Sequence, residues 1–118
     1  MAEVWEIVQK LLAKTRENRL VWRRSDIPRT IIATLPGPYT AELRKGVSAD
    51  GVASTLWFSL LDPEGNVVIE LSARMPGLTT PEAQAHFQNL DDLFRTAQAS
   101  LQRRDERLED LARRLDEM

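Results

Sequence analysis

The sequence predicts an α+β fold, in which an N-terminal helix, an antiparallel meander of four to five strands and a long C-terminal helix follow one another. Three observations predict it. Apolar residues recur at helical spacing near both ends of the chain. In the middle of the chain the apolar period shortens to two, as in strands with one buried face. Short turn signals separate these central runs, which favours neighbouring antiparallel strands.

The first predicted element is an amphipathic helix from residue 2 to about residue 16. Lys14 and Arg16 in its last turn suit the negative end of the helix dipole, and Asn18 is a suitable left-handed C-cap. Its apolar residues would form one buried stripe. They are Val4, Trp5, Ile7, Val8, Leu11 and Leu12.

A change of period after Asn18 predicts a short strand. Leu20 and Trp22 alternate with Val21, so we expect Leu20 and Trp22 to point inward. Arg23 and Arg24 would then lie on the exposed side and at the end of this strand. A connection between a helix and a strand therefore explains residues 18–24, and no catalytic role needs to be assigned to Trp22, Arg23 or Arg24.

Two further strands are predicted before a loop. Residues 29–35 are rich in Ile and Thr, and the Pro-Gly-Pro segment at 36–38 breaks that run. Residues 39–44 alternate again, so Pro-Gly-Pro either separates two strands or bends one longer strand. Residues 47–54 read as a loop with Asp50-Gly51 at its tightest point.

A hairpin is the clearest local signal in the sequence. Two strand-like runs, about 54–61 and 67–74, flank the turn Asp-Pro-Glu-Gly-Asn at 62–66. Trp57 points to the face opposite that of its neighbours, so it is either partly covered there or part of an exposed partner surface. Two apolar sets are each expected to share one face: Leu56, Phe58 and Leu60, then Val67, Ile69 and Leu71.

The last helix is predicted to be unusually long. Thr80 suits the N-cap, Pro81 the first helical position and Glu82 the positive end of the dipole. No helix breaker follows, so a continuous helix would extend about 55 Å at 1.5 Å per residue. We therefore divide the chain into a single α+β domain, residues 1–100, and a helical extension, residues 101–118.

Apolar residues at alternating spacings of three and four form a heptad seam along this helix, which indicates a coiled coil. Arg104 is its one polar member. We predict a homodimer through the extension, although the helix could instead break near Ser100 and fold back or fray, or order only on a different protein. The seam comprises Phe87, Leu90, Phe94, Ala97, Leu101, Arg104, Leu108, Leu111, Leu115 and Met118; the predicted association residues are Leu101, Arg104, Leu108, Leu111 and Leu115.

Composition limits the classes of function. The 118 residues contain no cysteine, which excludes disulfides and thiolate chemistry. No apolar run reaches the roughly 18 residues of a membrane span and the N-terminus lacks the basic start of a signal peptide, so we expect a cytoplasmic protein without membrane contact. The net charge of −2 combines a surplus of four basic residues over residues 1–46 with six surplus acidic residues over 47–118.

No motif indicates catalysis. The sequence lacks a phosphate-binding glycine loop, a Gly-x-Ser-x-Gly elbow and a His-Glu-x-x-His motif. His86 is the only histidine, and without cysteine it cannot anchor a typical zinc site. We therefore predict no enzyme activity, no cofactor and no metal, and interpret the chain as an interaction or assembly module.

Two alternatives to an assembly module stay open. Basic residues gather in the first quarter of the chain, and with Arg23 and Arg24 they could bind phosphate backbones in a nucleic-acid-associated regulator. Trp22 lies among them, but the alternation buries it, and the acidic pI of about 5.4 opposes this function. A curved sheet covered by helices could also enclose a pocket, as in a small-ligand sensor.

Three local motifs carry a resemblance. They are Leu-Leu-Ala-Lys-Thr at 11–15, Leu-Val-Trp at 20–22, and the run from Asp62 to Leu71. With these motifs the chain resembles a group of small, largely uncharacterised bacterial proteins over roughly residues 5–100. The resemblance implies a compact helix–sheet–helix domain and no activity. The length and heptad regularity of the last helix depart from it.

Overall fold

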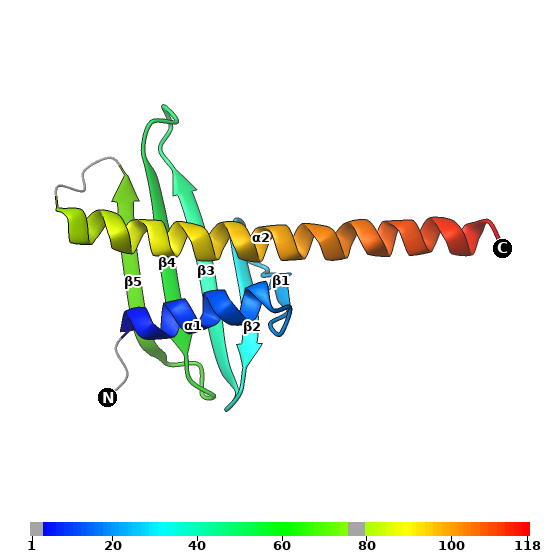
Figure 1. Cartoon of the computed structure of the whole chain (residues 1–118), viewed down its shortest axis with the longest axis horizontal. Coiled ribbons are helices and arrows are strands. Elements are labelled where there is room, and N and C mark those ends of the chain that lie inside the picture. Colours follow the sequence, from blue (N-terminus) through cyan, green and yellow to red (C-terminus); the bar gives the residue numbers. More distant parts are fainter. Residues whose placement is uncertain (1–3, 76–79) are drawn as a thin grey trace.

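Two helices cover one face of a five-stranded antiparallel sheet in the computed structural model, which describes residues 4–75 and 80–118 (Figure 1). The strands lie in the order β1-β2-β3-β4-β5, so each strand pairs with its neighbours in sequence. The predicted α+β meander is thus confirmed. The elements are α1 Val4–Arg16, β1 Trp22–Arg24, β2 Thr30–Leu35, β3 Tyr39–Val47, β4 Ser54–Leu61, β5 Val67–Met75 and α2 Pro81–Asp116.

The end of α1 closes as the sequence predicts. Asn18 adopts a positive φ of 59°, and the backbone N–H of Arg19 donates to the carbonyl of Lys14 at 2.9 Å. This is the capping pattern that satisfies the last carbonyls of a helix. The predicted helical residues 2 and 3 lie outside the described part of the chain.

A buried hydrogen bond ties α1 to β1. The indole N–H of Trp22 donates to the hydroxyl of Thr15 at 3.0 Å, and that hydroxyl donates to the carbonyl of Leu11 at 2.7 Å. Trp22 is only 1% exposed, whereas Val21 and Arg23 are exposed. The inward position predicted for Trp22 is therefore confirmed, and its one polar atom is satisfied inside the core.

The register of the sheet places paired apolar residues of neighbouring strands on the face that the helices cover. Ile31 of β2 pairs with Leu43, Leu43 with Phe58, and Phe58 with Leu71. Leu35 pairs with Tyr39 across the Pro-Gly-Pro segment, so this segment joins two strands and does not bend one. Both helices and this inner sheet face enclose the core (Figure 1).

The β4–β5 hairpin matches the prediction except at Val67. Leu56, Phe58 and Leu60 are buried as expected. Val67 was expected to share the inner face with Ile69, but it is 56% exposed and pairs with Leu61, while Ile69 pairs with Leu60. A register shift between Leu60 and Leu61 inserts one extra residue and turns Val67 to the other face.

The helix α2 sets the long dimension of the molecule. Thr80 caps it, with its hydroxyl accepting from the N–H of Ala83 at 3.1 Å, and Pro81 begins it, as predicted. Its 36 residues span about 54 Å, close to the longest extent of 57 Å. Among the described residues, no helix is both long and apolar enough to cross a membrane.

Candidate functional site

The first half of α2 belongs to the domain core and the second half leaves it. Leu101, which is 4% exposed, is the last buried residue of the helix. One turn later, the guanidinium of Arg24 donates to the carboxylate of Asp105 at 2.6 Å and so joins β1 to α2. Beyond Asp105, α2 projects past β1 as a straight rod (Figure 1).

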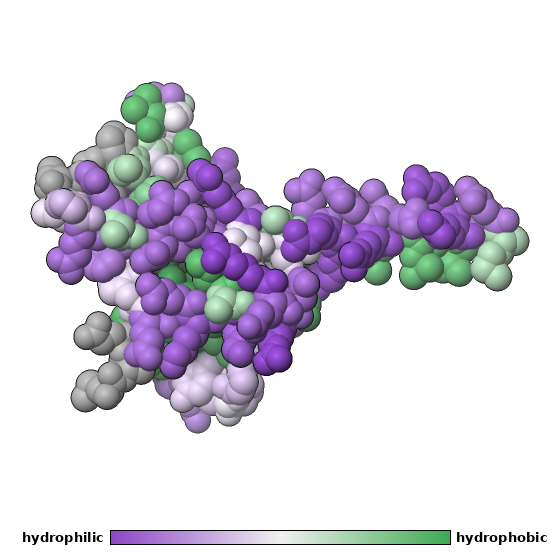
Figure 2. Space-filling model, in the orientation of Figure 1, coloured by the Kyte–Doolittle hydropathy of each residue, from purple (hydrophilic) through white to green (hydrophobic). Residues whose placement is uncertain are grey.

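The projecting half exposes an apolar row that we call the leucine stripe, formed by Leu108, Leu111 and Leu115. Their exposed fractions are 56%, 51% and 56%. Figure 2 shows an apolar patch along one side of the rod near its C-terminal end, with hydrophilic residues over the rest. Exposed leucines that line up on one side of a charged helix are typical of an interaction surface.

The remainder of the projecting helix stabilises itself. Both Arg113 and Arg114 contact the carboxylate of Asp110, at 2.8 and 2.9 Å. Such pairs three or four residues apart contribute about 0.2–0.5 kcal/mol each to an isolated helix. These ion pairs favour the helical conformation of the segment that carries the leucine stripe.

The structure corrects two expectations for the extension. Leu101 was predicted to be an association residue, but it packs in the domain's own core and is not available to a partner. The alternative of a break near Ser100 is wrong, because α2 is continuous from Pro81 to Asp116. Arg104 is exposed, as an association residue must be, although the neighbouring Asp105 is already engaged by Arg24.

The other three predicted partner residues do not form one surface. Trp57 lies half-buried on the sheet face away from the helices, with the guanidinium carbon of Arg44 4.4 Å from its ring centroid. Trp57 is thus partly covered by its own sheet. Arg23 is exposed on β1, three strands away or about 14 Å. Arg24 contacts α2 on the opposite side.

Trp57 also explains a glycine in β3. A Cβ added at Gly46 would lie 2.9 Å from the Trp57 ring, closer than side chains normally approach. The absence of a side chain at this position lets the ring lie over the neighbouring strand. Trp57 is therefore a packed residue of the outer sheet face.

The basic residues of the first quarter are partly paired. Lys10 contacts Glu6 at 3.2 Å, and Glu17 lies 3.7 Å from Lys14 and 3.8 Å from Arg19. These exposed pairs reduce the positive field that a phosphate backbone would meet. Because Trp22 is buried, it is also not available for stacking on a base.

His86 packs against α1 through an aromatic contact. Its ring stacks on that of Trp5, with the centroids 4.0 Å apart and 14° between the planes, and so joins α2 to α1. Within residues 4–75 and 80–118, no three His, Cys, Asp or Glu side chains come together as a metal site would require.

The sequence did not predict a cavity beside α2. Arg29 and Lys45 line a cavity of about 600 Å³ beside α2. A signal was present at Lys45, which lies two residues after the inward-pointing Leu43 and so has a charge at a core-facing position of β3. Arg29 belongs to the basic residues of the first quarter of the chain and was expected to begin a strand, but it precedes β2 in a loop, and nothing near it in the sequence indicated a cavity.

Comparison with known proteins identifies no relative, since no family model, no curated protein and no solved structure matches this chain. Functional inference therefore rests on the geometry of the chain itself.

Proposed function

We propose that this protein is a non-enzymatic assembly module that forms a homodimer through the leucine stripe of α2. The observation that carries the proposal is the stripe itself: Leu108, Leu111 and Leu115 are more than half exposed on a helix segment that has left its own domain. The stripe continues the three-and-four spacing of the buried half of α2, which is the spacing of helix pairs.

A second copy is the partner that this surface suits best. A row of leucines is complementary to itself, so two copies related by a two-fold axis would bury the same residues on both sides. The charged flanks of the helix stay in solvent in such a pair, as they do in the monomer. The alternative partner, a helix of a different protein, would need its own leucine row.

The expected affinity is modest. Full burial of an exposed leucine contributes about 1.5–3 kcal/mol. Each leucine of the stripe is already about half covered, so it would contribute about half of that value, and the six leucines of a dimer together would contribute roughly 5–9 kcal/mol. Association costs at least about 4 kcal/mol in lost translational and rotational freedom. The net gain is therefore at most about 5 kcal/mol, which corresponds to a dissociation constant of about 0.2 mM. At that affinity we expect a weak dimer, with almost all chains monomeric at about 10 μM and most of them dimeric at about 1 mM.

The experiment is sedimentation equilibrium of the full chain over that concentration range, with a variant carrying Leu108→Ala, Leu111→Ala and Leu115→Ala. Alanine keeps the helix and removes the stripe. The matched control is Glu106→Ala with Arg113→Ala, which leaves the net charge unchanged and alters charged, exposed positions of the same segment. The proposal requires the wild type and the control to dimerise and the triple variant to remain a monomer.

Two results contradict the proposal. A wild type that stays entirely monomeric at about 1 mM, the top of this concentration range, contradicts self-association through the leucine stripe. A triple variant that dimerises as well as the control would place the interface elsewhere on the molecule.

A further inference from the structure

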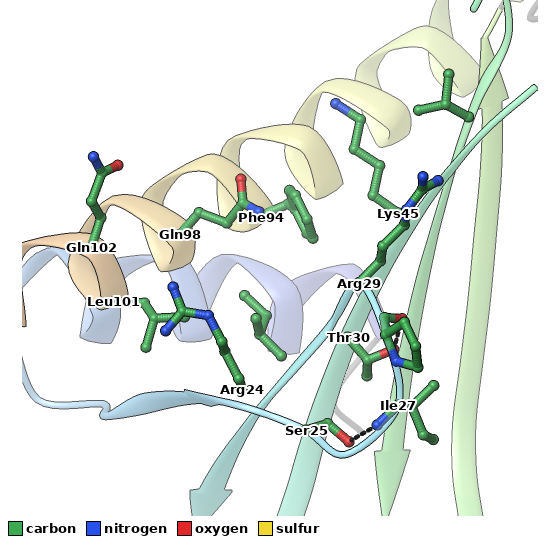
Figure 3. A pocket seen from close by; sticks show the side chains of 13 residues that line it. Arg24, Ser25, Ile27, Arg29, Thr30, Lys45, Phe94, Gln98, Leu101 and Gln102 are labelled. Carbon is green, nitrogen blue, oxygen red and sulfur yellow. Dashed lines mark hydrogen bonds between the residues drawn. The ribbon is translucent and has the colours of Figure 1, made fainter. Parts of the chain in front are cut away.

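A cavity of about 600 Å³ opens between α2, β3 and the loop that joins β1 to β2 (Figure 3). Its volume lies in the range of sites for small molecules. Ile31, Phe94 and Leu101, all of which are core residues, contribute its apolar wall. The cavity therefore combines an apolar floor with an opening to solvent.

The charges around this cavity have one sign. Arg24, Arg29 and Lys45 line it, and no carboxylate does. Arg24 is compensated by Asp105, which lies just outside the lining. Within the described part of the chain, the side chains of Arg29 and Lys45 make no ion pair and no hydrogen bond, so neither the half-buried ammonium of Lys45 nor the exposed guanidinium of Arg29 has an acidic partner.

Lys45 is placed where a sheet normally puts an apolar residue. It pairs with Leu56, which is buried, and its ammonium nitrogen lies 6.0 Å from the ring centroid of Phe94. Figure 3 shows this side chain extending from β3 toward α2. The Lys45 ammonium, which has no acidic partner among the described residues, is therefore available to an anion in the cavity.

The backbone fixes Arg29 next to Lys45. The N–H of Lys45 donates to the carbonyl of Arg29 at 3.4 Å, and the N–H of Ser25 donates to the carbonyl of Thr30 at 3.0 Å, which closes the loop. Arg29 has a φ of 59°, in the left-handed region that favours glycine. An arginine is thus held in a strained conformation at the cavity mouth, as residues of binding sites often are.

We infer that this cavity binds a small phosphate monoester that carries a flat apolar group. A phosphate monoester has a charge of about −1.5 to −2 at neutral pH, which matches the two uncompensated cations. Arginine and lysine both form strong charge-assisted hydrogen bonds to phosphate oxygens. The apolar group would lie against Phe94 and Ile31, and the amide of Gln98 offers a polar contact beside it.

The test is titration of the full chain with 1-naphthyl phosphate, followed by calorimetry and by backbone amide shifts in NMR spectra. Inorganic phosphate and 1-naphthol are titrated as control ligands, because the first carries only the charged group of the probe and the second only its apolar group. We expect 1-naphthyl phosphate to bind at least about tenfold more tightly than either fragment, since each fragment loses one half of the contacts. The shifts should concentrate at Thr30, Lys45 and Gln98.

Variants locate the site. Lys45→Gln and Arg29→Gln should each weaken binding of 1-naphthyl phosphate about tenfold or more, because each removes one charge-assisted hydrogen bond. Arg29→Gly is a second variant that removes the guanidinium while suiting the backbone at φ 59°, so it guards against misfolding. Arg23→Gln is the matched control, because Arg23 is exposed on β1 and does not line the cavity.

Two outcomes would overturn the inference: equal binding by the wild type and all these variants, or no shift at the cavity with 1-naphthyl phosphate at about 10 mM, the limit of useful affinity. The triple alanine variant of the leucine stripe should bind the probe as the wild type does. Failure of the dimer and failure of the ligand site are therefore distinguishable.

Discussion

The two halves of α2 share one apolar repeat and have opposite environments. Phe94 and Leu101 in the first half are almost completely buried, whereas Leu108 and Leu115 in the second half are more than half exposed. The spacing of seven residues is the same in both pairs. The comparison teaches that a period shows which side of a helix is apolar and does not show what covers that side.

The width of the apolar face does distinguish the halves. In the first half Leu93, which is fully buried, lies beside the seam residue Phe94 and widens the apolar face. In the second half the leucines stand in a single row, and Arg104 separates that row from the buried part. A wide face is typical of a helix on a sheet, and a narrow one is typical of a helix that pairs with another helix.

The largest expected difference between the halves is in stability. Leu93→Ala should lower the free energy of unfolding by about 2–5 kcal/mol, because it leaves a cavity in the core. The matched change Leu111→Ala should alter the monomer's stability by less than about 0.5 kcal/mol, since it removes an exposed side chain. Urea unfolding at low protein concentration measures both; equal losses would show that the stripe is covered within the monomer.

A smaller effect is expected at the boundary between the halves. Arg104→Leu joins the leucine stripe to the buried row and removes a charge from the seam, so dimerisation should strengthen about tenfold, or 1.4 kcal/mol. Sedimentation equilibrium measures the change, with Arg103→Leu as a control at the neighbouring exposed position. No gain over this control would mean that Arg104 lies outside the interface.

The smallest expected effect is the titration of Asp50, which lies in the loop between β3 and β4 and should leave both halves of α2 unchanged. The Ser48 hydroxyl and the Val52 N–H, which both bond to the Asp50 carboxylate, lower the pKa of Asp50. A lowered folded-state pKa means that this contribution to stability is complete above the ordinary aspartate range and is lost as the pH falls through the folded-state value. NMR shifts in the 48–53 loop should therefore titrate below the ordinary range, with α2 unchanged. A normal Asp50 titration would mean that these bonds do not persist in solution.

Much of the fold was predictable because each element had a local signal. Asn18 marked the end of α1, Thr80 and Pro81 marked the start of α2, and the period of two gave the inward side chains of β4. These signals depend on residues close together in the chain. The same holds for Trp22, whose buried position followed from alternation alone.

Features that depend on distant contacts were not predictable. The bulge that turns Val67 outward arises from pairing between β4 and β5. The burial of Leu101 depends on how far the sheet extends beneath α2, which no residue near Leu101 encodes. Arg29 and Lys45 meet only because β2 and β3 pair, so neither residue alone indicated a cavity.

The continuity of α2 has a mechanical consequence. Phe94 and Leu101 form part of the cavity wall, and the same unbroken helix carries Leu115 about 21 Å beyond Leu101. The near half is fixed in the core along its length by Leu90, Leu93 and Leu101. Because the helix is unbroken, this anchoring also sets the direction in which the projecting half leaves the domain.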